Sequence, residues 1–217
     1  MDLAGRLSRL YAAAAVMLAL SSGVSAAAEP SAGSGLPSRA SAIRHLSTIA
    51  IDNFGQISPH YYRGAQPKGR DYADLAALGV KTVIDLTKDG DSQEPSLAQA
   101  VGMKFYRIPM TTHDTPSAEK VAQFLKLVDD PANGPVYVHC QGGRHRTGVM
   151  TAIYRMSNDH WTADQAFAEM KKYKYGADFL HPEFKQFVYS YESLVQATAA
   201  PAVAAPSRAT ASSQAAR

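Results

Sequence analysis

The segment from residue 139 to residue 148 holds the residues best suited to chemistry. It reads His-Cys-Gln-Gly-Gly-Arg-His-Arg-Thr-Gly and contains the only cysteine of the 217 residues. A loop that joins a strand to a helix points successive backbone N–H groups into one concavity, and the helix N-terminus adds partial positive charge. The segment therefore predicts an anion-binding loop. Its candidate phosphate-binding residues are Gln141, Gly142, Gly143, Arg144, His145 and Arg146.

Cys140 and Arg146 are expected to act on the same anion. The Arg146 guanidinium can hold two phosphate oxygens at once, which a lysine ammonium cannot do. A thiol at a helix N-terminus among cations loses its proton more easily than a free thiol. We expect Cys140 to react as a thiolate and form a cysteinyl-phosphate, while the Thr147 hydroxyl stabilises the sulfur as leaving group. His139 is expected to hydrogen-bond the loop backbone.

Strands and helices alternate around this segment. The predicted strands, which are short, apolar and rich in β-branched or aromatic residues, are 61–63, 82–86, 104–108 and 136–139. Three predicted helices have both ends marked, at 71–78, 95–101 and 146–156. Two more are predicted from their starts, one at Pro116 with Thr115 as its N-cap and one at a capping box of Thr162 and Gln165. The last is an apolar stripe from 184 to 195. This order predicts an α/β three-layer sandwich, in which helices flank a largely parallel sheet of about four to five strands.

The two ends are expected to lie outside that fold. Residues 1–28 have the basic, apolar and small-residue regions of a secretory signal peptide. They predict a secreted or periplasmic protein with no stable membrane insertion after cleavage, and a retained anchor is the alternative. Residues 29–42 are typical of a flexible linker and 197–217 of a disordered Ala/Pro/Ser tail, so the domain is expected at 43–196.

Composition excludes several other classes of function. The chain carries 22 Lys+Arg against 19 Asp+Glu, and the formal charge of +3 resides in the two ends. No basic excess is left in the domain, so nucleic acid is not an expected partner. One cysteine excludes a disulfide framework, and the seven histidines include no closely spaced pair. We expect no metal, no cofactor and a monomer.

Three segments resemble the cysteine-based protein tyrosine phosphatase superfamily. Within it, the chain is most similar to the atypical dual-specificity phosphatases of plants and fungi and their bacterial relatives. The similarity lies in 53–67, in Val83-Ile84-Asp85-Leu86, and in the loop residues 143–148, and it spans roughly 50–190. It implies a dual-specificity phosphatase-like fold, and a substrate that is a phosphorylated protein or another phosphate monoester.

The resemblance also implies a general acid. In this superfamily an aspartate on a mobile loop, roughly 25–35 residues before the cysteine, protonates the leaving group. Asp114 lies 26 residues before Cys140 and is the best candidate, although its role could instead be a helix cap or a solvated loop residue. Asp89 and Asp91 are weaker candidates, and His113 could assist or replace Asp114.

Alternative functions stay open at this point. An inositol phosphate or phosphoinositide phosphatase would use the same loop, but such members favour several basic residues there. This chain offers Arg144 and Arg146, and has Gln141 and Gly142 directly after the cysteine. A rhodanese-type sulfurtransferase also uses an anion loop that starts with cysteine, without an upstream acid. A phosphoprotein-binding module with a silent site would usually have lost the cysteine or the arginine.

Overall fold

The computed structural model describes residues 49–199, with side chains through Glu192, and one sheet forms its centre. The strands are β1 Gly55–Ser58, β2 Tyr61–Ala65, β3 Thr82–Thr87, β4 Lys104–Met110 and β5 Val136–Cys140. Their spatial order is β1-β2-β5-β3-β4, with β1 antiparallel to β2 and the other pairs parallel. The predicted signal peptide (1–28), the predicted linker (29–42) and the predicted tail beyond residue 199 lie outside the described residues.

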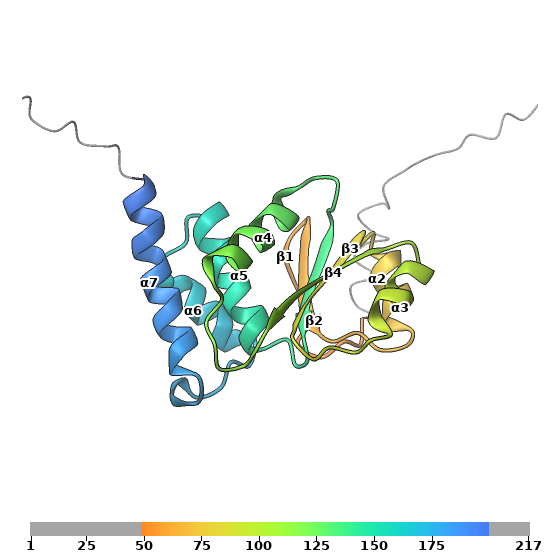
Figure 1. Cartoon of the computed structure of the whole chain (residues 1–217), viewed down its shortest axis with the longest axis horizontal. Helices are drawn as coiled ribbons and strands as arrows, with labels where there is room; N and C mark the ends of the chain where they lie inside the picture. Colours follow the sequence, from red (N-terminus) through yellow and green to blue (C-terminus); the bar gives the residue numbers. More distant parts are fainter. Residues whose placement is uncertain (1–48, 200–217) are drawn as a thin grey trace, which may run out of the picture. The chain divides into compact units, whose positions relative to one another are not determined.

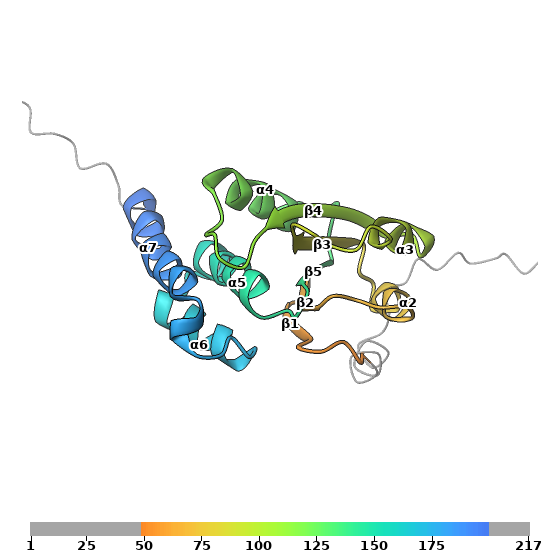
Figure 2. The same cartoon turned by 60° about the horizontal axis from the view of Figure 1, so that its bottom comes forward.

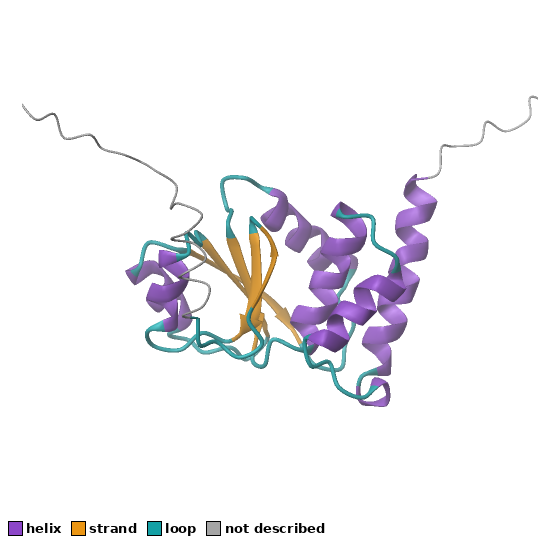
Figure 3. Ribbon diagram, turned by 180° about the vertical axis from the view of Figure 1, so that it is seen from behind, coloured by secondary structure: helices purple, strands orange, loops and turns teal. Residues whose placement is uncertain are grey.

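Helices cover both faces of the sheet (Figure 1). They are α2 Asp71–Ala77, α3 Glu94–Ala100, α4 Ala118–Asp129, α5 His145–Asn158, α6 Ala163–Lys172 and α7 Pro182–Ala199, with a short 3-10 turn η1 at Asp178–Leu180. α2 and α3 lie on one side, and α4 to α7 on the other, in the turned view (Figure 2) and from behind (Figure 3). The predicted α/β three-layer sandwich with a largely parallel sheet is confirmed.

Local sequence explains where most helices begin, with one correction. The capping box of Thr162 and Gln165 is present at the start of α6, as predicted. The predicted cap of α4 was wrong, because Ser117 rather than Thr115 accepts the hydrogen bond from the Lys120 backbone N–H. Serine caps a helix as well as threonine does, so the helix begins two residues later and Pro116 precedes it.

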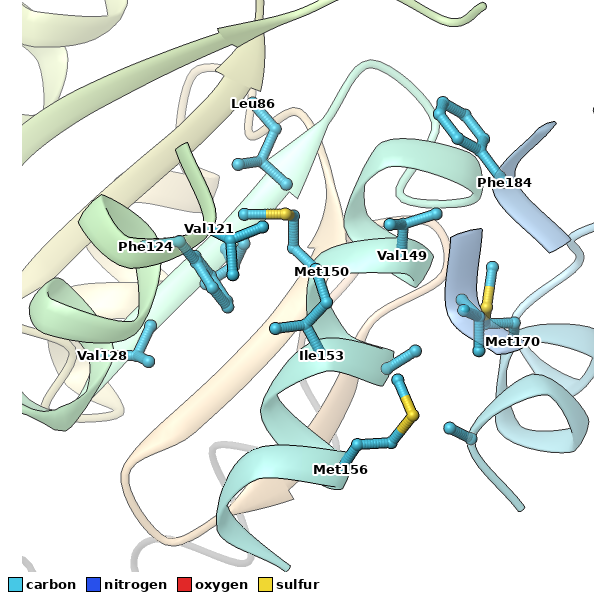
Figure 4. Packing of buried hydrophobic residues seen from close by; sticks show 14 of the residues in the cluster. Leu86, Val121, Phe124, Val128, Val149, Met150, Ile153, Met156, Met170 and Phe184 are labelled. Carbon is cyan, nitrogen blue, oxygen red and sulfur yellow. The ribbon is translucent and has the colours of Figure 1, made fainter. Parts of the chain in front are cut away.

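Helix α5 is the centre of the larger hydrophobic cluster (Figure 4). Its residues Val149, Met150, Ile153 and Met156 are all buried, and they pack with side chains from the sheet and from α4, α6 and α7. The remaining polar side chains of α5 lie mainly at its two ends, so the middle of the helix is enclosed. This packing fixes the axis of α5, and therefore the place of its N-terminus.

The carboxyl ends of the parallel strands meet at one edge of the sheet. β5 ends at Cys140, β4 at Met110 and β3 at Thr87, and Ala65 at the end of β2 lies in register with Cys140. Open α/β sheets bind their ligands outside this edge. Among the described helices, none combines the length and the apolar character needed to cross a bilayer.

Candidate active site

The predicted anion loop lies between β5 and α5, at the carboxyl edge of the sheet. Gly143 has φ +62°, and a side chain there would overlap the Gly64 carbonyl on β2. Position 143 therefore needs glycine for both its conformation and its close approach to β2. Gly142 differs, because an added Cβ would meet only the Arg144 side chain at an ordinary 3.7 Å.

The loop forms a pocket of about 240 Å³ that contains most of the predicted site residues. Its lining consists of Thr112, Cys140, Gln141, Gly142, Arg144, His145 and Arg146. Cys140 and Arg146 are both buried at its base, with exposed fractions of 3% and 6%. The structure thus brings the candidate nucleophile and the candidate phosphate-binding arginine to the same cavity.

Arg146 is held in place while part of its guanidinium stays available. Its Nη1 donates a 3.2 Å hydrogen bond to the Met110 carbonyl at the end of β4. Its Nε and the Thr147 Oγ1 have no hydrogen-bond partner among the described residues. Buried donors without partners are uncommon, and Arg146 lines the loop pocket in which an anion would bind. The Thr147 hydroxyl therefore has no competing partner among the described residues.

Charges at the start of α5 favour an anion. The first turn of α5 contains no acidic residue, and it begins with His145 and Arg146. Helices usually place carboxylates at this end, because the dipole is positive there. The first turn of α5 has no carboxylate and carries the Arg146 guanidinium, so the electrostatic potential at this end is strongly positive. Burial, together with the neighbouring His181 ring, lowers the pKa of His145.

Arg63 supports the loop from below, a role that sequence analysis missed. Its guanidinium is fully buried, donates to the Gly143 carbonyl and lies 4.0 Å from the centre of the Tyr173 ring. Asn53 adds a 2.8 Å bond to the same carbonyl and a 2.7 Å bond to the Tyr173 carbonyl. Sequence analysis noted Asn53 only as part of a family resemblance, and Arg63 only for that resemblance and as the end of a predicted strand. This geometry gives both residues a physical role.

His139 does not hydrogen-bond the loop backbone, contrary to expectation. Neighbouring residues of a strand point to opposite faces, so His139 points toward α3 while Cys140 faces the loop. Its Nε2 lies 3.0 Å from Glu94 and its Nδ1 lies 3.9 Å from Asp85, and all three side chains are buried. Arg107 pairs with Asp85 at 2.6 Å. This buried cluster of charges was not visible in the sequence, because its members come from different elements.

The Asp114 carboxylate does not reach the Cys140 pocket in this conformation. It is exposed, accepts a 2.7 Å hydrogen bond from the Thr111 hydroxyl, and lines a neighbouring pocket beside Lys88. Thr112, from the same loop, does line the Cys140 pocket. Acid residues often reach their working position only when substrate binds, so Asp114 stays a candidate although its carboxylate lies outside the Cys140 pocket here.

The weaker acid candidates lie at different distances from the loop. Asp89 lines a pocket of about 470 Å³ together with Gln141 and Arg146. Asp91 instead lies in the turn before α3, where its side chain accepts a hydrogen bond from the Gln93 backbone N–H. His113 lies next to another histidine, with its ring centre 5.9 Å from that of His181. Asp89 is therefore the second carboxylate near the pocket.

Comparison with known proteins agrees with this geometry. The chain is 33% identical to the dual specificity protein phosphatase TpbA of Pseudomonas aeruginosa. The aligned 124 residues make up 57% of this chain and 56% of that protein. It is 26% identical to the inositol diphosphatase SIW14 of Saccharomyces cerevisiae over 58% of this chain and 47% of that protein. The chain spans about half the length of both relatives.

Solved structures show the same fold. The crystal structure of TpbA matches with a TM-score of 0.59 at 27% identity, and covers 69% of this chain and 92% of that one. A TpbA variant in complex with phosphotyrosine matches with a TM-score of 0.58 at 27% identity, over 68% of this chain and 90% of that one. The family model described as DSP-PTPase phosphatase fused to NAD+ kinase matches residues 51–188. Because that model covers well over half of the sequence, this chain belongs to the DSP-PTPase phosphatase family, a branch of the cysteine-based protein tyrosine phosphatases.

Proposed function

We propose that this chain is an exported phosphatase that hydrolyses phosphate monoesters through a cysteinyl-phosphate. Its substrates are phosphotyrosine alone, or phosphotyrosine together with phosphoserine and phosphothreonine. The observation that carries the proposal is the pocket in which Cys140 and Arg146 lie at the N-terminus of α5. Cysteine-based family membership and the phosphotyrosine complex of TpbA support the reaction and the substrate.

The first half of the reaction transfers the phosphoryl group to sulfur. Arg146 and the loop N–H groups hold the phosphate oxygens, and the Cys140 thiolate attacks phosphorus. The bond from phosphorus to the leaving oxygen breaks, and Asp114 gives that oxygen its proton. For this step the loop from Thr111 to Ser117 has to move, so that Asp114 exchanges its bond with Thr111 for one with the leaving oxygen.

The second half releases phosphate. Asp114, now a carboxylate, takes a proton from a water molecule as the water oxygen attacks phosphorus. The phosphorus–sulfur bond breaks, and Cys140 leaves as a thiolate that accepts a hydrogen bond from Thr147. The unpartnered Thr147 Oγ1 supports this role, because a buried hydroxyl without a partner is otherwise costly.

One observation favours a second substrate class, inositol phosphates. The pocket of about 470 Å³ beside the Cys140 pocket shares Thr112, Gln141 and Arg146 with it, and Lys88 and Asp89 also line it. A substrate with several phosphates would place one on the loop and a second beside the Lys88 ammonium. The relative SIW14 carries the name inositol diphosphatase, which fits this alternative.

Residues 1–28 support the exported location, because their basic, apolar and small-residue regions are in the order of a cleaved signal. N-terminal sequencing of protein recovered from the periplasm or medium tests this part. A mature chain that starts near Ala27 or Glu29 agrees with export, whereas a retained Met1 contradicts it.

Phosphate release without added metal tests the activity. Four substrates are compared: a phosphotyrosine peptide, a phosphoserine peptide, phosphatidylinositol phosphates and inositol hexakisphosphate, with Cys140→Ser as the blank. Fastest release from the phosphotyrosine peptide agrees with the main proposal. Faster release from inositol compounds favours the second class, and then Lys88→Ala should reduce that rate selectively. No release from any substrate by the folded protein contradicts both.

A further inference from the structure

Two groups of side chains in the described part of the chain have the geometry to hold a metal ion. The first is Asp85, Glu94 and His139, the buried cluster behind the loop. It already contains a cation, because Arg107 lies 2.6 Å from Asp85 and 3.8 Å from Glu94. The Arg107 guanidinium already balances both carboxylates, so this group does not need a metal.

The second group lies at the rim of the active site. His113 belongs to the loop that carries Asp114, and His181 and Glu183 lie at the start of α7. One ligand atom from each of the three side chains lies within 4.8 Å of the others. His181 Nδ1 is 3.4 Å from Glu183 Oε1, and the described salt bridges of Glu183 include no lysine or arginine.

These ligand types and distances suit zinc. Two imidazoles and one carboxylate with an open fourth position are a known zinc ligand set. Zinc bonds to nitrogen and oxygen are about 2.0–2.2 Å long, so in a tetrahedral site two ligand atoms of one ion lie about 3.3–3.6 Å apart. The His113 side chain is exposed, and a small shift of its loop would bring the three atoms to that spacing.

We propose that His113, His181 and Glu183 form a regulatory binding site for a divalent transition-metal ion, with zinc as the preferred ion by ligand type. The ion ties the loop from Thr111 to Ser117 to the start of α7. In the conformation that brings the ligands together, Asp114 is bonded to Thr111 and lies outside the Cys140 pocket. Bound metal therefore holds the acid away from the leaving group and slows turnover.

This inhibition rests on the proposed function, since it acts through Asp114 as the general acid. It has a distinctive pattern, because the acid matters most for poor leaving groups. Zinc should inhibit hydrolysis of a phosphoserine or phosphotyrosine peptide several-fold more strongly than hydrolysis of p-nitrophenyl phosphate. Zinc bound to the Cys140 sulfur would instead inhibit all substrates equally.

Direct binding is measured first, in a form that needs no activity. The untagged full chain with Cys140→Ser has no thiol, so titration with Zn²⁺ in a calorimeter, and with Co²⁺ by visible absorption, reports oxygen and nitrogen ligands. We expect one site per chain. Glu183→Gln and His113→Ala should weaken it at least about tenfold, the scale on which even outer-shell changes act. His60→Gln, at an exposed histidine between β1 and β2, is the matched control and should bind as the parent does.

Glu183→Gln is the safest variant, because His181 also packs against Phe184 and its loss disturbs the start of α7. In the chain with Cys140 intact, Glu183→Gln should keep metal-free activity and lose the substrate-selective inhibition. Equal zinc affinity in Glu183→Gln, His113→Ala and His60→Gln would overturn the site. Equal inhibition of both substrate types would overturn the mechanism of regulation. A protein that binds zinc at these residues but hydrolyses nothing would refute only the proposed function.

Discussion

Replacing Gly143 by alanine tests the loop geometry most directly. The residue has φ +62°, a conformation that costs a non-glycine residue about 1–2 kcal/mol. The new Cβ would also overlap the Gly64 carbonyl and lie 2.6 Å from the Ala65 nitrogen. Both neighbours are backbone atoms of β2, so no side chain can turn aside to make room, and the loop itself has to shift.

The size of the effect follows from that shift. Restoring ordinary contact requires the loop to move by about 1 Å, and a displacement of that size costs roughly 10²-fold in rate. The same movement strains the bonds from Asn53 and Arg63 to the Gly143 carbonyl, so stability falls as well, by about 2 kcal/mol or more. We expect kcat/KM to fall roughly 100-fold and the midpoint of thermal unfolding to decrease.

Gly142→Ala is the matched control, because its Cβ would have ordinary clearance and its φ is not in the left-handed region. Both variants are assayed with p-nitrophenyl phosphate, which does not depend strongly on the general acid, and by thermal unfolding. Gly142→Ala should lose less than tenfold in kcat/KM. If Gly143→Ala is no slower and no less stable than Gly142→Ala, the argument from close approach to β2 is wrong.

Four further variants follow from the same structure. Asp114→Asn should lose roughly 10²–10⁴ in rate on phosphotyrosine peptide and much less on p-nitrophenyl phosphate; full peptide activity would reject the residue. Arg63→Met should lower kcat on both substrates, because the loop loses its support from β2. Ser117→Ala removes the cap of α4, so it should lower the free energy of unfolding by about 1 kcal/mol and leave the rate unchanged. Hydrogen bonds from Lys171 and Lys185 lower the pKa of Asp178, so this carboxylate stabilises the fold above about pH 4 and loses that effect as pH falls. Asp178→Asn should therefore lower the unfolding midpoint at pH 7 and reduce its decline in acid.

The elements around the site were predictable because their signals are local. Apolar β-branched runs mark β3 and β5, and the capping box at Thr162 depends on residues three apart. β1 was missed because Gly-Gln-Ile-Ser is only four residues long and has a single strong strand former, Ile57, and because it pairs only at the sheet edge. The start of α4 was misplaced because Thr115 and Ser117 are both suitable caps.

The arrangement of the candidate site was predictable only in part, for a related reason. Cys140 and Arg146 lie in one short loop, so their spacing alone indicates a shared anion. The support from Arg63 and the environment of His139 depend on which strands lie side by side. His113 and His181 are far apart in sequence, and only the packing of α7 against the rest of the domain brings their rings together.

The bonds beneath the loop separate the residues that give it its shape from those that line its opening. Asn53 and Arg63 hold the Gly143 carbonyl from the inner side, so the loop keeps its shape whatever side chains stand on its outer side. Gln141 and Arg144 are exposed and line the mouth of the pocket. Substitutions at these two positions can change which substrates are accepted without disturbing the nucleophile, so divergence of specificity within the family should concentrate there.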